Sequence, residues 1–159
     1  MVFPEAMKTF ETHSADETTD LGRQISADLK PGAIVLLRGD LGAGKTTLVK
    51  GIAEGFHAAL AEDVTSPTFT LIHEYRGPEV TLFHIDLYRV DTQRELDTLA
   101  IDDLMDANTI LLIEWGEKFS RFVNERDVEI AIEHLGGDDR RISLFSKIPS
   151  QSEETLSAE

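Results

Sequence analysis

Short apolar runs alternate along this chain with segments whose apolar residues recur every three or four positions. Two runs are almost continuously apolar, AIVLL at 33–37 and TILLIEW at 109–115. Runs of this length are typical of strands buried on both faces of a parallel sheet. We therefore expect an α/β fold of three layers, in which a mainly parallel central sheet lies between helices.

Other segments alternate apolar and polar residues, as strands with one exposed face do. FTLIHEY at 69–75 and VTLFHIDLY at 80–88 flank the turn residues 76–79, while DVEIAIEHL at 127–135 and RRISLFS at 140–146 flank GGDD at 136–139. Both pairs predict antiparallel hairpins, the second as an edge hairpin. A further short strand is expected over 8–12, and SPTFT at 66–70 is expected to be a turn-rich loop.

Three helices are predicted. The S-x-x-E pattern at Ser14–Glu17 is a capping box, which opens a helix to about Leu29 that KPG at 30–32 then ends. A second helix follows Gly44. The segment RELDTLAIDDLMD at 94–106 predicts a third helix, with a buried stripe of Leu96, Leu99, Leu104 and Met105.

Length and charge narrow the possible functions. With 159 residues, of which 41% are hydrophobic, we expect a single domain over residues 1–146 and a disordered acidic tail over 147–159. Thirty acidic and fifteen basic residues give a formal net charge of −15. This charge repels a polyanion, so the chain is not expected to bind tRNA or other nucleic acid by itself.

The composition also bears on the cellular compartment. The chain has no cysteine, so disulfides and thiolate metal sites are excluded. Its first residues lack the pattern of a signal peptide, and no apolar stretch approaches the roughly 20 residues of a membrane helix. We expect a soluble, cytoplasmic protein that does not act at a membrane.

The segment LLRGDLGAGKTTLVKG at 36–51 contains the strongest motif. Gly39, Gly44, Lys45 and Thr46 fit the pattern G-x-x-x-x-G-K-[ST], between an expected strand and an expected helix. The glycines let several backbone N–H groups point at one centre, and the helix adds its positive end. We expect this loop to bind the phosphates of a nucleotide, with Lys45 on the β- and γ-phosphates and the Thr46 hydroxyl on Mg²⁺.

Two carboxylates end predicted strands at the same edge of the sheet. Glu114 follows ILLI and is assigned to Mg²⁺, while Asp86 follows LFHI and could complete the metal shell or polarise water. The structural alternative for Asp86 is a salt bridge to Arg89. No N-K-x-D segment for reading guanine is present, so ATP is the expected nucleotide.

Other residues near the motif remain ambiguous. Ser66, Thr68 and Thr70 lie on the loop where many phosphate-loop proteins sense the γ-phosphate, and a plain turn is equally compatible with this sequence. His84 shares a strand face with Asp86 and is interpreted as a packed histidine. Trp115 could belong to the core or to the nucleotide pocket. Asp40 inside the loop has no explanation at this level, because a carboxylate beside a triphosphate is unfavourable.

Four ordered motifs, GDLGAGKTT, SPTFTL, HIDLYR and LLIEW, resemble the TsaE (YjeE) family, the small ATPase of tRNA threonylcarbamoyladenosine (t6A) synthesis, over about Thr18–Ile142. The resemblance implies a role in modifying adenosine 37 of tRNA. It also implies that TsaD and TsaB are the partners, with tRNA reached only through them, and that ATP and Mg²⁺ are the cofactors.

Carried over to this sequence, the resemblance implies that Lys45, Asp86 and Glu114 are catalytic and that Thr46 and Glu114 bind the metal. It also implies an adenine pocket bordered near Ser14 and near Gly137. The full set of residues expected to bind the nucleotide is Gly39, Asp40, Leu41, Gly42, Ala43, Gly44, Lys45, Thr46, Thr47, Ser14 and Gly137.

Two other functions are compatible with a phosphate loop. A small-molecule kinase needs an arginine-rich lid, which is not visible between Leu96 and Asn108. A nucleotide-dependent binding module needs no hydrolysis, and the carboxylates Asp86 and Glu114 argue against it. We expect an ATPase that is slow without its partners, because no arginine is an unambiguous finger.

Overall fold

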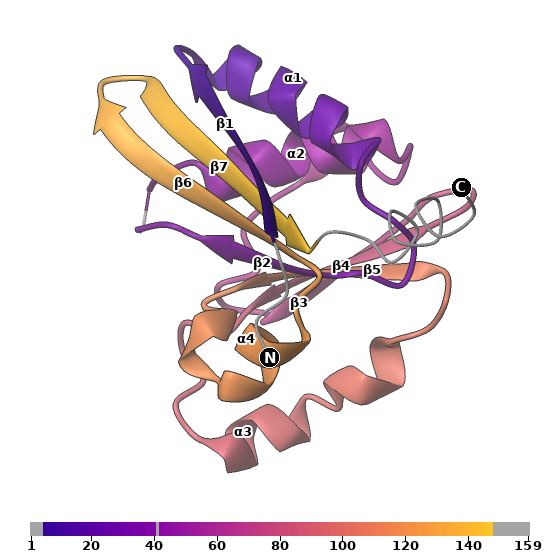
Figure 1. Ribbon diagram of the computed structural model, residues 1–159. Coiled ribbons are helices and arrows are strands. Elements are labelled where there is room, and N and C mark those ends of the chain that lie inside the picture. Colours follow the sequence, from indigo (N-terminus) through magenta and orange to yellow (C-terminus); the bar gives the residue numbers. More distant parts are fainter. Residues whose placement is uncertain (1–4, 41, 148–159) are drawn as a thin grey trace, which may run out of the picture.

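The computed structural model describes residues 5–40 and 42–147, which form a seven-stranded sheet covered by helices on both faces (Figure 1). The strands are β1 (Glu5–Thr12), β2 (Ile34–Arg38), β3 (Ile72–Arg76), β4 (Thr81–Asp86), β5 (Thr109–Glu114), β6 (Val128–Gly136) and β7 (Asp139–Lys147). The helices are α1 (Ala15–Ser26), α2 (Lys45–Gly55), α3 (Gln93–Thr98) and α4 (Ser120–Glu125), with 3₁₀ turns η1 (Ala61–Asp63), η2 (Ile101–Leu104) and η3 (Gly116–Lys118).

The expected three-layer α/β fold is confirmed. The strand order is β1-β7-β6-β2-β5-β4-β3, and β6, β2, β5 and β4 run parallel. Val35 and Leu37 of β2 pack into the core beneath α1 and α2, whereas Ile34 and Leu36 pack into the core on the opposite face. This two-sided burial is why the central strands are apolar at nearly every position.

The edges of the sheet are antiparallel, as predicted, but the strand at one edge is not the predicted one. The β3–β4 hairpin forms as predicted, and β6 and β7 pair antiparallel around the predicted turn. This second hairpin is not at the edge, because β1 pairs with the outer side of β7 from Glu5↔Lys147 to Thr12↔Arg140. The N-terminal strand thus satisfies backbone groups of β7 that an edge would expose.

Helix α1 begins where the capping box predicts. The Ser14 hydroxyl accepts a hydrogen bond from the Glu17 N–H at 3.0 Å, while the Glu17 carboxylate accepts from the His13 N–H, one residue earlier than in the usual box. The helix ends at Ser26, before the predicted end at Leu29. It packs closely on α2, since a Cβ on Gly51 would lie 1.9 Å from the Thr19 carbonyl oxygen.

The predicted helix over 94–106 is interrupted. Helix α3 ends at Thr98, Ala100 adopts a left-handed conformation with φ 51°, and η2 follows. Leu96 is buried, and Leu99, Leu104 and Met105 still pack against the same core. Contact with the sheet is therefore kept at the cost of helical continuity.

The predicted boundary of the C-terminal tail at residue 147 needs one correction. Lys147 belongs to β7, so the tail does not begin there, and residues 148–159 lie outside the described residues.

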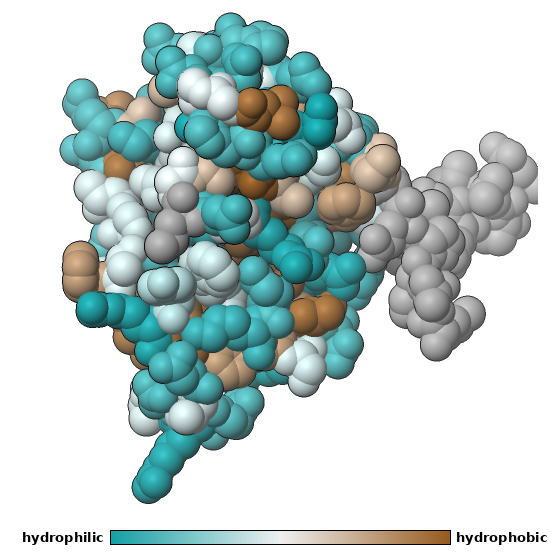
Figure 2. All heavy atoms as spheres, turned by 90° about the vertical axis from the view of Figure 1, so that its left-hand side faces the viewer, coloured by the Kyte–Doolittle hydropathy of each residue, from teal (hydrophilic) through white to brown (hydrophobic). Residues whose placement is uncertain are grey.

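In the described part of the chain, no helix is both long and apolar enough to span a membrane. On the face shown in Figure 2, hydrophilic residues predominate and the hydrophobic ones are scattered.

Candidate functional site

The phosphate loop connects β2 to α2 in the expected strand–loop–helix context. Gly39, Gly42 and Gly44 all have positive φ, at 155°, 79° and 110°, which side-chain-bearing residues rarely adopt. Gly44 is the N-cap of α2 and provides no side-chain cap for the first N–H groups of that helix. These donors suit a phosphate at the positive end of the helix. Leu41, also expected to bind the nucleotide, lies outside the described residues.

Lys45 is buried at the start of α2, with 5% of its surface exposed. Its Nζ donates to the Gly39 carbonyl oxygen at 2.6 Å and lies 3.6 Å from Glu114 Oε1. The same Nζ lies 4.5 Å from the centroid of the Trp115 ring. A carbonyl, a carboxylate and an aromatic face thus hold the ammonium group inside the phosphate loop.

The two predicted carboxylates lie beside each other. Asp86 of β4 and Glu114 of β5 are paired in the parallel register, and both are buried. They share the sheet face that α1 and α2 cover, because their neighbours Leu82 and Leu112 pack there. The carboxyl ends of these strands therefore bring both groups to the phosphate loop.

His84 makes a contact that its position in the sequence did not reveal. Its Nε2 lies 2.5 Å from Glu114 Oε2, and the ring is fully buried. Period-two spacing places His84 on the same face as Asp86, but only the register between β4 and β5 brings it to Glu114. The interpretation of His84 as merely packed is therefore incomplete.

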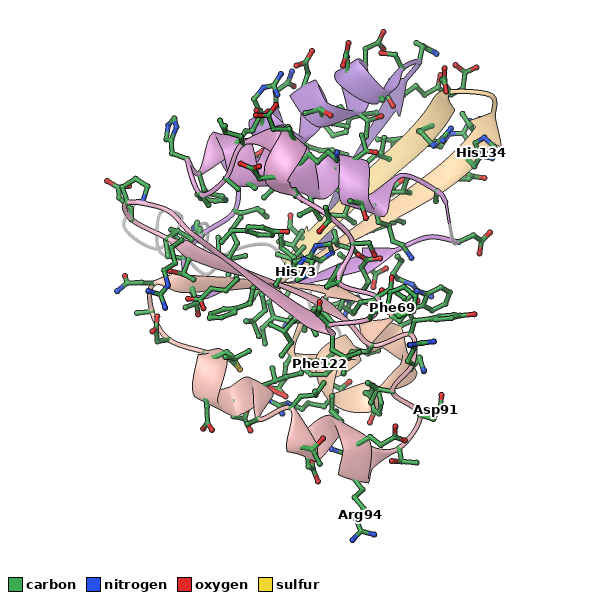
Figure 3. The ribbon with its side chains drawn as sticks, turned by 180° about the vertical axis from the view of Figure 1, so that it is seen from behind. Phe69, His73, Asp91, Arg94, Phe122 and His134 are labelled. Carbon is green, nitrogen blue, oxygen red and sulfur yellow. The ribbon has the colours of Figure 1, made fainter. Side chains whose placement is uncertain are left out.

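Asp86 is held by the predicted loop over 66–70. Its Oδ2 accepts from the Thr68 hydroxyl at 3.0 Å, and its Oδ1 accepts from the Tyr88 N–H at 2.9 Å. The suggested salt bridge to Arg89 is not formed: Asp86 is held by Thr68 and Tyr88, and the Arg89 guanidinium lies 4.7 Å from the centroid of the Phe69 ring. Phe69 itself is 79% exposed and lies on the outside of the molecule (Figure 3).

Trp115 belongs to the site rather than to the interior alone. It adopts a left-handed conformation with φ 63° directly after β5, and its ring lies 5.2 Å from that of Tyr88. Its Nε1 is buried, and no residue in the described part of the chain forms a hydrogen bond with it. After this turn, Lys118 donates to the carbonyl oxygens of Leu87 and Tyr88, which fixes the segment that follows Asp86.

Two segments that are distant in sequence meet at the phosphate loop. Arg140 Nε donates to the Ala43 carbonyl oxygen at 2.7 Å, and its Nη1 donates to the Gly137 carbonyl oxygen at 2.9 Å. Beside them, His13 Nδ1 lies 2.9 Å from Asp139 Oδ1, and this hydrogen bond raises the pKa of His13 above 6.5. Gly137 is thus linked to the loop through Arg140, while Ser14 directly follows the His13 that bonds to Asp139. Neither Arg140 nor His13 carried a motif that pointed to this role.

The remaining predicted residues have simpler surroundings. Asp40 is exposed, so its carboxylate is solvated. Thr46 and Thr47 are half-buried in the first turn of α2. Within residues 5–40 and 42–147, no three His, Asp or Glu side chains gather into a group that could hold a metal. Mg²⁺ sites need fewer protein ligands when phosphates supply the rest, and the Thr46 and Glu114 oxygens suit that requirement.

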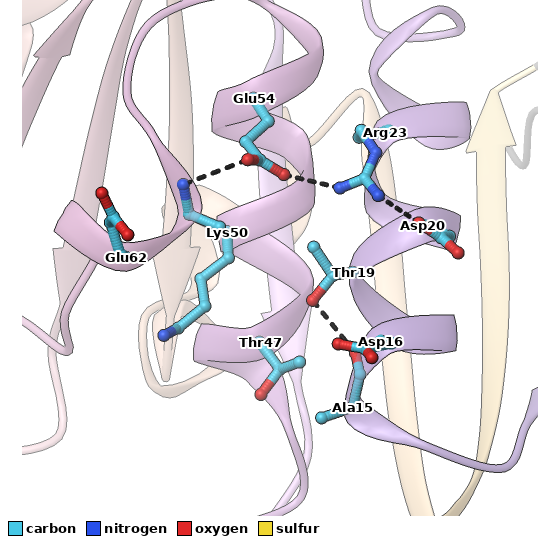
Figure 4. Close-up of a pocket in the computed structure, with 10 residues that line it drawn as sticks. Ala15, Asp16, Thr19, Asp20, Arg23, Thr47, Lys50, Glu54 and Glu62 are labelled. Carbon is cyan, nitrogen blue, oxygen red and sulfur yellow. Dashed lines mark hydrogen bonds and ion pairs between the residues drawn. The ribbon is translucent and has the colours of Figure 1, made fainter.

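A separate groove of about 600 Å³ runs between α1 and α2 (Figure 4). Arg23 crosses it, pairing with Asp20 on its own helix and with Glu54 of α2 at 2.5 Å. Lys50 and Thr47 of α2 also line the groove. Of the residues expected to bind the nucleotide, Thr47 lines this groove, whereas the predicted catalytic residues Lys45, Asp86 and Glu114 do not.

Comparisons with known proteins agree on one family. The family model "Threonylcarbamoyl adenosine biosynthesis protein TsaE" matches residues 12–142. The chain is 36% identical to the tRNA threonylcarbamoyladenosine biosynthesis protein TsaE of Bacillus subtilis over 85% of this chain and 83% of that protein. It is 40% identical to the protein of the same name from Haemophilus influenzae, over 72% and 70% of the two chains. The crystal structure of B. subtilis YdiB matches with a TM-score of 0.73 and 29% identity, over 99% of this chain and 96% of that one.

Proposed function

The chain belongs to the TsaE family of threonylcarbamoyl adenosine biosynthesis proteins, and we propose that it acts there as a Mg²⁺-dependent ATPase. The observation that supports the proposal is the contact between buried Lys45 and buried Glu114, placed beside the uncapped start of α2. A cation and a carboxylate at this position suit a nucleotide phosphate and its metal ion.

The residues present fit ATP and Mg²⁺. The loop is open at Gly42, where a Cβ would meet nothing within 4 Å, whereas a Cβ on Gly39 would lie 2.7 Å from the Ile132 carbonyl oxygen. Lys45 supplies the positive charge for the β- and γ-phosphates, and the Thr46 hydroxyl and the Glu114 carboxylate would hold the metal. When bound, Mg²⁺ neutralises charge that develops on the phosphate oxygens.

Asp86 is proposed to orient the attacking water. Its carboxylate is buried beside Glu114, and it is held by the Thr68 hydroxyl and the Tyr88 N–H. Two hydrogen bonds fix its direction, which is what a residue that positions water needs. The Thr68 contact also makes the position of Asp86 depend on the order of the loop over 66–70.

The proposed partners are TsaB and TsaD, with ATP hydrolysis permitting repeated turnover of t6A synthesis at tRNA position 37. The Arg89 guanidinium lies 4.7 Å from the centroid of the Phe69 ring on this loop, so it is engaged there rather than at the phosphate loop. A partner that reorders this loop or supplies a cation can raise turnover by roughly 10³ or more. The net charge of −15 favours contact with tRNA through proteins rather than directly, and we place the reaction in the cytoplasm.

A steady-state phosphate-release assay tests this function. The protein, the TsaB–TsaD pair and tRNA are each left out in turn, with and without Mg²⁺. We expect slow hydrolysis by the protein alone, stimulation by the pair and little effect of tRNA alone. A protein that is already fast alone, that is stimulated by free tRNA, or that phosphorylates a metabolite would contradict the proposal.

A further inference from the structure

His84 places an imidazole among buried apolar residues of β4, two positions before Asp86. Leu82, Phe83 and Ile85 around it are buried core residues, and His84 itself is 0% exposed. Its Nδ1 is buried and has no hydrogen-bond partner among the described residues. An apolar side chain at this position would avoid burying two ring nitrogens. The one polar contact that His84 makes is therefore the feature to explain.

That contact is a hydrogen bond to the carboxylate assigned to the metal. A carboxylate only accepts hydrogen bonds, so the proton between His84 Nε2 and Glu114 Oε2, 2.5 Å apart, lies on the histidine. The other oxygen of Glu114 is 3.6 Å from Lys45 Nζ. Each oxygen of this carboxylate thus has one buried partner, and the partners come from different elements, β4 and α2.

We propose that His84 is a positioning residue for Glu114. By binding Oε2, it fixes the rotation of the carboxylate and leaves Oε1 directed at Lys45 and the phosphate loop. Without this bond, Glu114 would be free to turn and its alignment for a metal ion would be lost. Partners of this kind behind a ligand typically change metal affinity or activity by about 10–100-fold. The inference rests on the proposed function, since it requires that Glu114 serves Mg²⁺.

Matched variants separate positioning from packing. His84→Gln places an amide donor near the position of Nε2, whereas His84→Asn has a similar polarity but ends too far from Glu114. Calorimetry with a non-hydrolysable ATP analogue, in Mg²⁺ and in EDTA, gives the gain in affinity that the metal provides. We expect His84→Asn to lose roughly tenfold or more of this gain. His84→Gln should retain most of it, and affinity in EDTA should be unchanged in both.

A double variant tests whether His84 acts through Glu114. Adding His84→Asn to Glu114→Gln should cause no further loss of the metal-dependent gain. A further loss, an unchanged gain in His84→Asn alone, or equal losses in the Asn and Gln variants would overturn the inference. A wild-type protein without metal-dependent binding would instead contradict the proposed function itself, so the two failures can be told apart.

A spectroscopic measurement needs no substitution of His84. In proton NMR of the wild-type protein, the Nε2–H of His84 should appear as a far-downfield signal that is protected from exchange. Glu114→Gln should move it upfield, because a neutral amide oxygen is a weaker acceptor than a carboxylate. The absence of the signal, or a signal that Glu114→Gln leaves in place, would overturn the inference.

Discussion

The Thr68 hydroxyl donates a 3.0 Å hydrogen bond to the Asp86 carboxylate. This bond joins the loop over 66–70 to the buried end of β4, next to Glu114. The loop that a partner can reach is therefore in direct contact with a carboxylate that the proposed reaction needs. The position of one cannot change without affecting the other.

Thr68→Val removes this hydrogen bond with little change of shape. We expect hydrolysis to fall roughly tenfold, because a hydrogen bond to a charged group contributes about 1.5 kcal/mol or more. Nucleotide affinity should stay the same, since the Thr68 hydroxyl bonds to Ser66 and Asp86 rather than to a residue expected to bind the nucleotide. Thr70→Val, on the same loop, is the control. Equal rates in the two variants would show that the bond has no catalytic importance.

Lys45→Ala should abolish hydrolysis and weaken ATP binding by roughly tenfold or more, because it removes the charge for the β- and γ-phosphates. Calorimetry and phosphate release measure the two effects. Lys50→Ala provides a matched control, since Lys50 lies on the same helix but lines the groove beside α1. Undiminished turnover in the Lys45 variant would exclude the phosphate loop from the mechanism.

Trp115 should report nucleotide binding through its fluorescence. It is the only tryptophan of the chain, and its ring lies 4.5 Å from Lys45 Nζ. Moving that ammonium group from the Gly39 carbonyl toward a phosphate changes the field at the indole. We expect the emission to change on addition of ATP or ADP with Mg²⁺. Calorimetric binding without any spectral change would contradict this prediction.

Phe69→Ser should lower the stimulation by TsaB and TsaD roughly tenfold or more, because large exposed aromatic residues often dominate the energy of an interface. The rate of the isolated protein should change little. Leu60→Ser is the control, because Leu60 is also exposed, at 60% against 79% for Phe69, but follows the far end of α2. Equal stimulation of both variants would place the docking surface elsewhere.

The His13–Asp139 pair predicts a dependence on pH. Asp139 raises the pKa of His13 above 6.5, chiefly through their hydrogen bond, and Glu17 and Glu11 add smaller effects. A raised pKa means that the pair stabilises the fold fully below 6.5 and loses this contribution as pH rises through the folded pKa. NMR titration should show the pKa of His13 falling toward its ordinary value in Asp139→Asn. An unchanged pKa would show that the pair does not form in solution.

Local patterns predicted the elements that local chemistry determines. The Gly-rich motif identified the β2–loop–α2 unit, and Ser14 marked the start of α1. The apolar runs identified β2 and β5, because both faces of these strands are covered. The break at Ala100 was not predictable from periodicity, since packing of η2 against the sheet overrides the local helical pattern there.

Contacts between distant segments could not be predicted in the same way. The sequence indicated that Asp86 and Glu114 would reach the same edge, but the bond from His84 to Glu114 depends on the register of β4 against β5. The positions of Arg140 and of β1 depend on the strand order. Such pairings join residues far apart in the chain, and no spacing rule encodes them.

The pairing of β1 with β7 affects how the protein is made on the ribosome. β1 is synthesised first among the described elements, yet its partner β7 is synthesised last. The nascent chain must therefore hold β1 unpaired while the intervening strands emerge. The bond from Arg140 to the phosphate loop forms at the same late stage. The candidate site is thereby completed only after β7, the last of the described strands, has been made.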